Sequence, residues 1–91
     1  MIQREVVILN RLGLHARAAA KLAKIASSFQ CEVKLARAGR NEFINGKSIL
    51  GILMMAAGPG TALSVTADGS DESAAMAALE ELIQNRFGEA D

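Results

Sequence analysis

The sequence is poor in the residues that build metal sites, disulfides and aromatic stacking surfaces. It contains no tryptophan and no tyrosine, and it has one histidine, one cysteine and one proline among 91 residues. The lone Cys31 has no partner for an intramolecular disulfide, so we expect it to pack as a small hydrophobic side chain. One histidine, one cysteine and no carboxylates at ligand spacing argue against a zinc site. With 3% aromatic residues, the chain offers few rings for base stacking, which argues against a small RNA-binding domain.

Net charge is absent as well, because ten lysines and arginines balance ten acidic residues. This balance argues against general nucleic-acid binding. The charges are nevertheless separated along the chain. Residues 1–40 hold eight of the basic residues and two acidic ones, whereas residues 41–91 hold two basic and eight acidic ones. Such a separation can steer a partner to one face, although ordinary solvated charge is the simpler interpretation.

Long hydrophobic runs are missing, although 51% of the residues are hydrophobic. The apolar run over residues 49–57 is too short to span a bilayer, contains Gly51, and is followed by Gly58 and Pro59. No charged-then-apolar leader opens the chain. We therefore expect a cytoplasmic protein without direct membrane insertion. The length suits a single domain over residues 1–91 with an aliphatic core.

Hydrophobic periodicity is what the chain does have, and it alternates between strand and helix spacing. The predicted elements, in chain order, are a strand over 2–9, a helix over 16–29, strands over 31–35 and 42–45, a helix over 48–55, a strand over 62–66 and a last helix that ends before Gly88. Val6 and Ile8 share one face of the first strand. Ser70 is expected to cap the last helix, with Asp71 and Glu72 at its positive end.

The predicted strands carry polar residues at alternate positions, so only one face of each strand suits a core. This favours an antiparallel sheet over a parallel sheet covered on both sides. The sequence therefore predicts an α+β fold. We expect an open-faced β-sandwich of order β-α-β-β-α-β-α, in which a four-stranded antiparallel sheet carries three helices on one face.

His15 lies where the first predicted strand gives way to a helix. Imidazole titrates near neutrality and can act as a nucleophile. A helix N-terminus presents free backbone N–H groups and the positive end of the helix dipole, so it favours a bound phosphate. We expect His15 to accept a phosphoryl group that the N–H groups of Ala16 and Arg17 and the Arg17 guanidinium would hold. The simpler interpretation is a loop histidine beside a solvated arginine.

Residues 10–19, which read NRLGLHARAA, closely resemble the active-site signature of the HPr family. This family comprises the histidine-containing phosphocarriers of the bacterial phosphotransferase system. A second match lies at residues 46–51, GKSILG. The resemblance implies that His15 takes a phosphoryl group on Nδ1 from phosphorylated enzyme I and passes it to a IIA-type protein. It implies a monomeric stoichiometric carrier without a cofactor, not an enzyme.

Ala18 departs from this resemblance, because the family usually has proline at that position. Proline early in a helix stiffens the first turn at no loss of a backbone hydrogen bond. Alanine keeps helix propensity and adds one N–H group. The departure therefore concerns the rigidity of the site more than its chemistry.

Ser48 is a second candidate for phosphorylation. In a subset of the family the serine at this motif position is phosphorylated by HPr kinase/phosphorylase, and the surrounding residues 46–49 resemble that subset. A phosphate there would add roughly −2 charge and repel an acidic partner. The alternative is that Ser48 only caps the short helix that follows.

The predicted short helix is apolar on all sides, whereas one face is enough for a core. Ile52, Met55 and Ala56 are expected to supply that core face. The remaining apolar residues form the expected partner-docking surface, which is Ile49, Leu50, Leu53 and Met54. In the resembling family this helix is the docking platform beside the active histidine. The alternative is that all of these side chains are core.

Lys24 and Lys47 would extend a positive rim around His15 and recruit acidic partner surfaces. A second function remains open beside the carrier. In this alternative the chain is a regulatory binding module, whose docking to target proteins is switched by phosphorylation without onward transfer. The combination of His15 with Arg17 favours the carrier.

Overall fold

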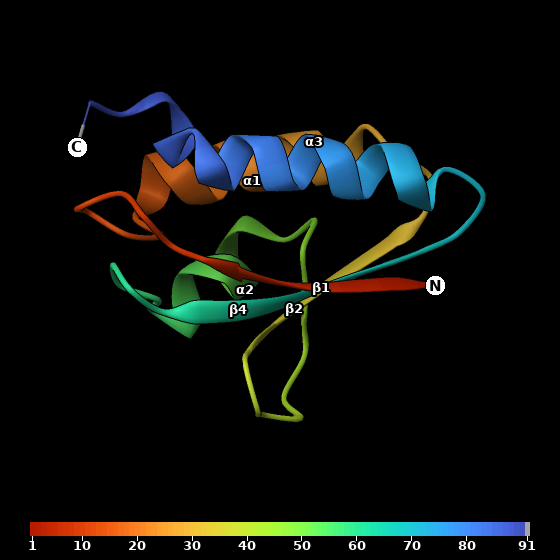
Figure 1. Ribbon diagram of the computed structural model, residues 1–91, viewed down its shortest axis with the longest axis horizontal. Coiled ribbons are helices and arrows are strands. Elements are labelled where there is room, and N and C mark those ends of the chain that lie inside the picture. Colours follow the sequence, from red (N-terminus) through yellow and green to blue (C-terminus); the bar gives the residue numbers. More distant parts are fainter. Residues whose placement is uncertain (91) are drawn as a thin grey trace.

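The computed structural model describes residues 1–90 and contains a four-stranded antiparallel sheet with the strand order β1-β4-β2-β3 (Figure 1). The elements are β1 (Ile2–Val7), α1 (Ala16–Ser27), β2 (Glu32–Arg37), β3 (Ile44–Asn45), α2 (Ile49–Met55), β4 (Ala62–Asp68), α3 (Glu72–Gln84) and the short 3₁₀ turn η1 (Arg86–Gly88). Helices α1 and α3 lie side by side over the sheet, and α2 packs near the ends of β2 and β3. The predicted open-faced α+β sandwich is confirmed.

The sheet is built around β4, which pairs with β1 on one side and with β2 on the other. Successive side chains of a strand point to opposite faces, so one face of β4 places Leu63, Val65 and Ala67 in the core. Val6 and Ile8 are also buried, as the alternation of residues 2–9 predicts. The predicted hairpin strand over 42–45 is shorter than expected, because β3 contains only two residues.

Small side chains let α1 pack closely against α2 and α3. Its buried face consists of Ala18, Ala19, Leu22, Ala23 and Ala26. The core is therefore aliphatic, and Phe87 is its one fully buried ring among residues 1–90. Cys31 is buried at the start of β2, as expected for a small hydrophobic side chain.

The predicted cap of the last helix is wrong. Ser70 does not cap α3, because the N-cap position is Asp71, and this residue makes no side-chain cap hydrogen bond. Its carboxylate instead accepts hydrogen bonds from the backbone N–H groups of Gln30 (2.8 Å) and Cys31 (2.9 Å). The carboxylate of Asp71 therefore binds the end of the α1–β2 loop and does not cap α3.

The chain turns directly after α3. Arg86, Phe87 and Gly88 follow one another in the left-handed region, with φ of 54°, 56° and 76°. The Phe87 ring is fully buried, and its carbonyl accepts a hydrogen bond of 2.7 Å from Lys21 Nζ on α1. Helix α3 runs antiparallel to α1, from Asp71 beside Gln30 to Phe87 beside Lys21, and Glu89 after the turn contacts His15 at the N-terminus of α1.

Candidate functional site

The loop that precedes α1 is fixed by a close approach to the segment after α2. Gly13 has a φ of +65°, and a Cβ at this position would lie 2.5 Å from the carbonyl oxygen of Ala57. The next residue, Leu14, donates its backbone N–H to that same carbonyl (2.9 Å). Only glycine fits this position, and it sets where His15 enters the helix.

His15 occupies the N-cap position of α1. Its Nδ1 atom accepts a hydrogen bond of 3.3 Å from the backbone N–H of Arg17, and its carbonyl accepts the first helical hydrogen bond, from Ala19. Nδ1 therefore directs its lone pair at the backbone N–H of Arg17 in the first turn. The side chain is 28% exposed, so the ring is accessible at the surface.

A carboxylate occupies the other side of the ring. Glu89 Oε2 contacts His15 Nε2, and Glu89 Oε1 accepts a hydrogen bond of 3.0 Å from Asn10 Nδ2. Asn10 is fully buried, and its Nδ2 also donates to the carbonyl of Gly13 (2.8 Å). Since both partners of Asn10 are acceptors, the orientation of its amide is determined.

Glu89 is an acid whose environment favours its charged form. The hydrogen bond from His15 and then that from Asn10 lower the pKa of Glu89, and the charge of Lys21 adds to this effect. Glu89 is not among the site residues predicted from the sequence. The sequence shows only an acidic residue shortly after the last helix, and no local pattern predicts that this residue contacts the start of α1.

Arg17 lies in the first turn of α1 with its side chain exposed. Among residues 1–90, no carboxylate forms a salt bridge with its guanidinium. Ala18 is fully buried, so its methyl group takes part in the core. The N–H groups of residues 16–18 precede the first helical hydrogen bond and stand at the positive end of the helix.

Helix α2 ends next to the same loop, because the carbonyl of Ala57, two residues after this helix, accepts the backbone N–H of Leu14. Ser48 is its N-cap, and Ser48 Oγ accepts a hydrogen bond of 3.1 Å from the backbone N–H of Gly51. Ile49, Leu50 and Met54 are exposed by 46%, 67% and 76% of their surface. The interpretation that all apolar residues of this helix are core is therefore wrong for these three.

The buried face of α2 differs from the expected one in one residue. Ile52 is fully buried and Met55 partly buried, as expected. Ala56, however, is exposed and ends the helix in the left-handed conformation, and Ala57 is buried in its place. Leu53 packs partly against the core, so it contributes less to the exposed surface than its predicted neighbours.

Comparisons with known proteins show the family of the chain. The sequence model described as "PTS HPr component phosphorylation site" matches residues 2–85. The chain belongs to the HPr family. Members of this family are phosphocarriers of the phosphotransferase system.

Individual HPr proteins resemble the chain over its whole length. It is 52% identical over 89 residues to the phosphocarrier protein HPr of Cupriavidus necator, covering 98% of both chains. The crystal structure of HPr-C-His from Thermoanaerobacter tengcongensis covers 100% of both chains at 36% identity and a TM-score of 0.93. A crystal structure of an HPr dimer from that organism covers 98% of this chain and all of its own, at 37% identity and a TM-score of 0.76.

The two lysines predicted to recruit partners lie apart from His15. Lys47 Nζ donates a hydrogen bond of 2.8 Å to the carbonyl of Phe29, which ties the segment before α2 to the end of α1. Lys24 lies in the last turn of α1, about 13 Å along the helix axis from His15 at 1.5 Å per residue. The expected positive rim at His15 therefore reduces to the exposed Arg17, because Lys21 Nζ, like Lys47 Nζ, is bound to a backbone carbonyl.

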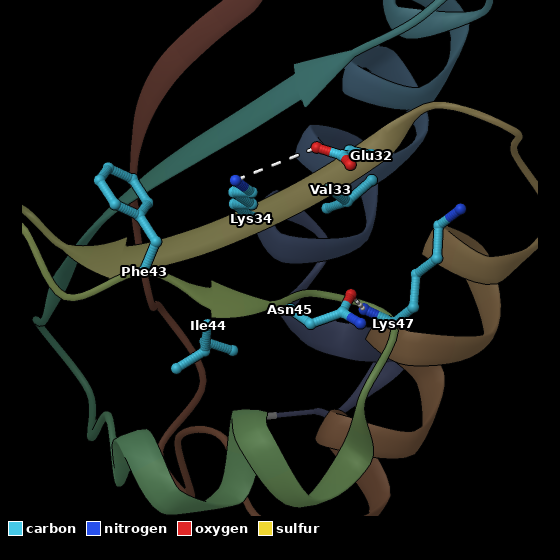
Figure 2. A pocket seen from close by; sticks show the side chains of 7 residues that line it. All are labelled: Glu32, Val33, Lys34, Phe43, Ile44, Asn45 and Lys47. Atoms are coloured by element: carbon cyan, nitrogen blue, oxygen red, sulfur yellow. Dashed lines mark hydrogen bonds and ion pairs between the residues drawn. The ribbon is translucent and has the colours of Figure 1, made fainter.

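Figure 2 shows a hollow at β2 and β3, lined by Glu32, Val33, Lys34, Phe43, Ile44, Asn45 and Lys47. It contains a surface ion pair between Lys34 and Glu32 (4.0 Å) and shares no residue with the His15 site. Within residues 1–90, no three His, Cys, Asp or Glu side chains are grouped so as to hold a metal ion. In the same residues, no helix is both long and apolar enough to cross a bilayer.

Proposed function

We propose that residues 1–91 form a single-domain phosphocarrier that accepts a phosphoryl group on His15 from phosphorylated enzyme I and passes it to IIA-type proteins. The observation that carries this proposal is the position of His15 Nδ1, which accepts the backbone N–H of Arg17 in the first turn of α1. Such groups bind phosphate oxygens through hydrogen bonds and through the helix dipole.

The Nδ1 lone pair forms the new N–P bond while the bond between phosphorus and the donor breaks, and that electron pair leaves with the donor. The phosphoryl oxygens then replace Nδ1 as the acceptor for the Arg17 N–H, with the Ala16 N–H beside it. The exposed Arg17 guanidinium adds a charge-assisted hydrogen bond. The carrier acts stoichiometrically in the cytoplasm, as a monomer and without a cofactor.

The test is incubation with enzyme I and phosphoenolpyruvate, followed by intact mass measurement. We expect the wild-type chain to gain one acid-labile phosphate and His15→Ala to gain none. Arg17→Ala is the matched variant, because its side chain is exposed and its backbone N–H is kept. It should still gain one phosphate, but more slowly. An acid-labile phosphate on His15→Ala would refute the proposal.

A regulatory binding module is the second candidate, and the exposed Leu50 and Met54 favour it because a docking surface needs no phosphotransfer. Adding a IIA-type acceptor to the phosphorylated chain separates the two functions. A carrier loses its phosphate to the acceptor, whereas a module keeps it.

Phosphorylation of Ser48 by HPr kinase/phosphorylase is a regulatory mark that we include in the proposal. The support is the placement of Ser48 directly before Ile49 and Leu50, two exposed residues of the expected docking surface. A phosphate at this point would place charge beside apolar docking contacts and weaken them.

A further inference from the structure

We infer that Glu89 is a positioning residue for phosphotransfer, because its carboxylate holds the proton of His15 on Nε2 and leaves Nδ1 free to attack. This inference rests on the proposed function, in which Nδ1 is the phosphoryl acceptor. It gives a role to the acidic tail, whose contact with His15 joins residues 74 positions apart in the sequence.

The hydrogen-bond partners of the ring determine its tautomer. Nδ1 faces a donor, the backbone N–H of Arg17, and Nε2 faces an acceptor, the carboxylate of Glu89. A neutral imidazole satisfies both partners only with its proton on Nε2. The opposite tautomer would place an N–H against an N–H at Nδ1 and a lone pair against a carboxylate at Nε2.

The position of Glu89 is itself held from several sides. Asn10 Nδ2 binds its second oxygen, and the side chain of Glu89 is only 15% exposed. The residues before it adopt left-handed backbone conformations at Arg86 and Phe87, which are unfavourable for residues other than glycine. Burial of the Phe87 ring and the hydrogen bond from Lys21 to the Phe87 carbonyl stabilise this turn after α3. An unfavourable backbone that is held in this way points to a positioned side chain.

The carboxylate also suits the charge that appears during transfer. When Nδ1 forms the N–P bond, the proton stays on Nε2, so the phosphorylated ring carries a positive charge. The carboxylate of Glu89 faces this charge directly and forms a charge-assisted hydrogen bond with the Nε2–H. No proton has to move in either direction of transfer, and the lowered pKa of Glu89 keeps its carboxylate charged at neutral pH.

Glu89→Gln is the informative variant because it keeps the size of the side chain and removes the charge. The amide cannot satisfy both neighbours. If its oxygen accepts from Asn10, its NH₂ group faces Nε2 and draws the ring proton to Nδ1. If its oxygen faces Nε2–H, two NH₂ groups meet at Asn10.

The first measurement is ¹⁵N NMR of the imidazole in the unphosphorylated chain, which reports the tautomer without any partner protein. We expect the Nε2–H form in the wild type and a marked rise of the Nδ1–H form in Glu89→Gln. Glu81→Gln is the matched control, since Glu81 is an exposed carboxylate on α3. Its spectrum should equal that of the wild type.

The second measurement is the rate of phosphorylation by enzyme I and phosphoenolpyruvate. We expect Glu89→Gln to be about tenfold slower and Glu81→Gln to be unchanged, a factor that corresponds to about 1.4 kcal/mol. Equal tautomers and equal rates in Glu89→Gln and wild type would overturn the inference, even if the variant unfolds more easily. A faster Glu89→Gln would also overturn it, because the tail would then obstruct the ring. If the wild type accepts no phosphate, the proposed function fails, and the NMR result still decides the tautomer.

Discussion

Asp71 illustrates how one carboxylate links two parts of the chain. It stands before α3, yet it accepts the backbone N–H groups of Gln30 and Cys31 at the start of β2. The hydrogen bond from Gln30 is the largest cause of a pKa below the ordinary value of 3.8, and the bond from Cys31 adds to it. Burial, with the nearby Asp71, raises the pKa of the Cys31 thiol, which stays protonated and structural.

This arrangement predicts how stability depends on pH. A lowered folded-state pKa means that the charged carboxylate favours the folded chain above the ordinary pKa, and that this contribution is lost as pH falls through the folded value. We expect Asp71→Asn to unfold at a lower urea concentration than wild type at pH 7. The difference should shrink below about pH 4, where the carboxylate of the unfolded wild-type chain begins to take up its proton while the folded one still resists it.

The measurement is urea unfolding followed by circular dichroism between pH 7 and pH 3. Glu42→Gln is the control, because Glu42 is an exposed carboxylate in the loop before β3. A gap between Asp71→Asn and wild type that stays constant down to pH 3 would show that the charge of Asp71 is not its cause.

Sequence reasoning found His15 and missed Glu89 for a physical reason. A single imidazole at a predicted helix start is a local pattern with few alternative uses. Glu89 reaches that imidazole only because three successive left-handed residues turn the chain, and two of them, Arg86 and Phe87, are residue types that rarely adopt this conformation. The contact is therefore a product of tertiary packing.

At the scale of the element, α2 was predictable and the start of α3 was not. Ser48 caps α2 as expected, because its Oγ accepts the backbone N–H of Gly51. At α3 the expected cap, Ser70, is followed by a stronger acceptor, Asp71, whose carboxylate is drawn to β2. Glu72 accepts the N–H of Gly69 (3.1 Å), so the side-chain bond at the start of α3 comes from Glu72 and not from the predicted cap.

The cap at Ser48 allows its structural and regulatory roles to be separated. Ser48→Ala removes the acceptor for the Gly51 N–H and should lower the unfolding free energy by about 1 kcal/mol. Ser48→Asp keeps an acceptor at that point, so its stability should stay near that of the wild type. Its charge beside Ile49 should slow phosphorylation by enzyme I by roughly tenfold, as expected where charge governs association.

The measurements are urea unfolding and the rate of phosphorylation of each variant. Ser70→Asp is the control for charge alone, because Ser70 is exposed and lies before α3, at the opposite end of that helix from Glu89. The proposal for Ser48 also requires that HPr kinase/phosphorylase and ATP give an acid-stable phosphate on the wild type. That phosphate on Ser48→Ala would contradict the assignment.

For the molecule as a whole, alternation along the strands was sufficient to predict the sheet. β1, β2 and β4 each bury one face, and antiparallel pairing of β4 with both neighbours follows from one common core under α1 and α3. The placement of basic residues was less predictable. The counts along the chain gave a basic half, but packing directs Lys47 to a carbonyl and Lys24 to the far end of α1.

The distribution of exposed apolar side chains therefore matters more for partner docking than these two lysines. Leu50 and Met54 are exposed by 67% and 76% of their surface, and both lie on α2. The segment after this helix contacts the Gly13 loop, which leads into His15. Since they contribute little to the core, Leu50→Ser and Met54→Ser should each change the unfolding free energy by less than about 0.5 kcal/mol.

If enzyme I binds this surface, removal of the Leu50 or Met54 side chain should raise the KM of enzyme I for the carrier by roughly tenfold. The rate at saturation should change little. Phe43→Ser is the matched control, because Phe43 is also exposed (43%) and points away from Ile44 and the adjoining helix in Figure 2. Steady-state phosphorylation at several concentrations of the carrier gives both constants. A loss confined to the saturated rate would assign Leu50 and Met54 to the alignment of His15, and an equal loss in Phe43→Ser would move the docking surface to the sheet. A rise in KM confined to α2 fits a carrier whose partners bind the helix and reach the imidazole from the same side.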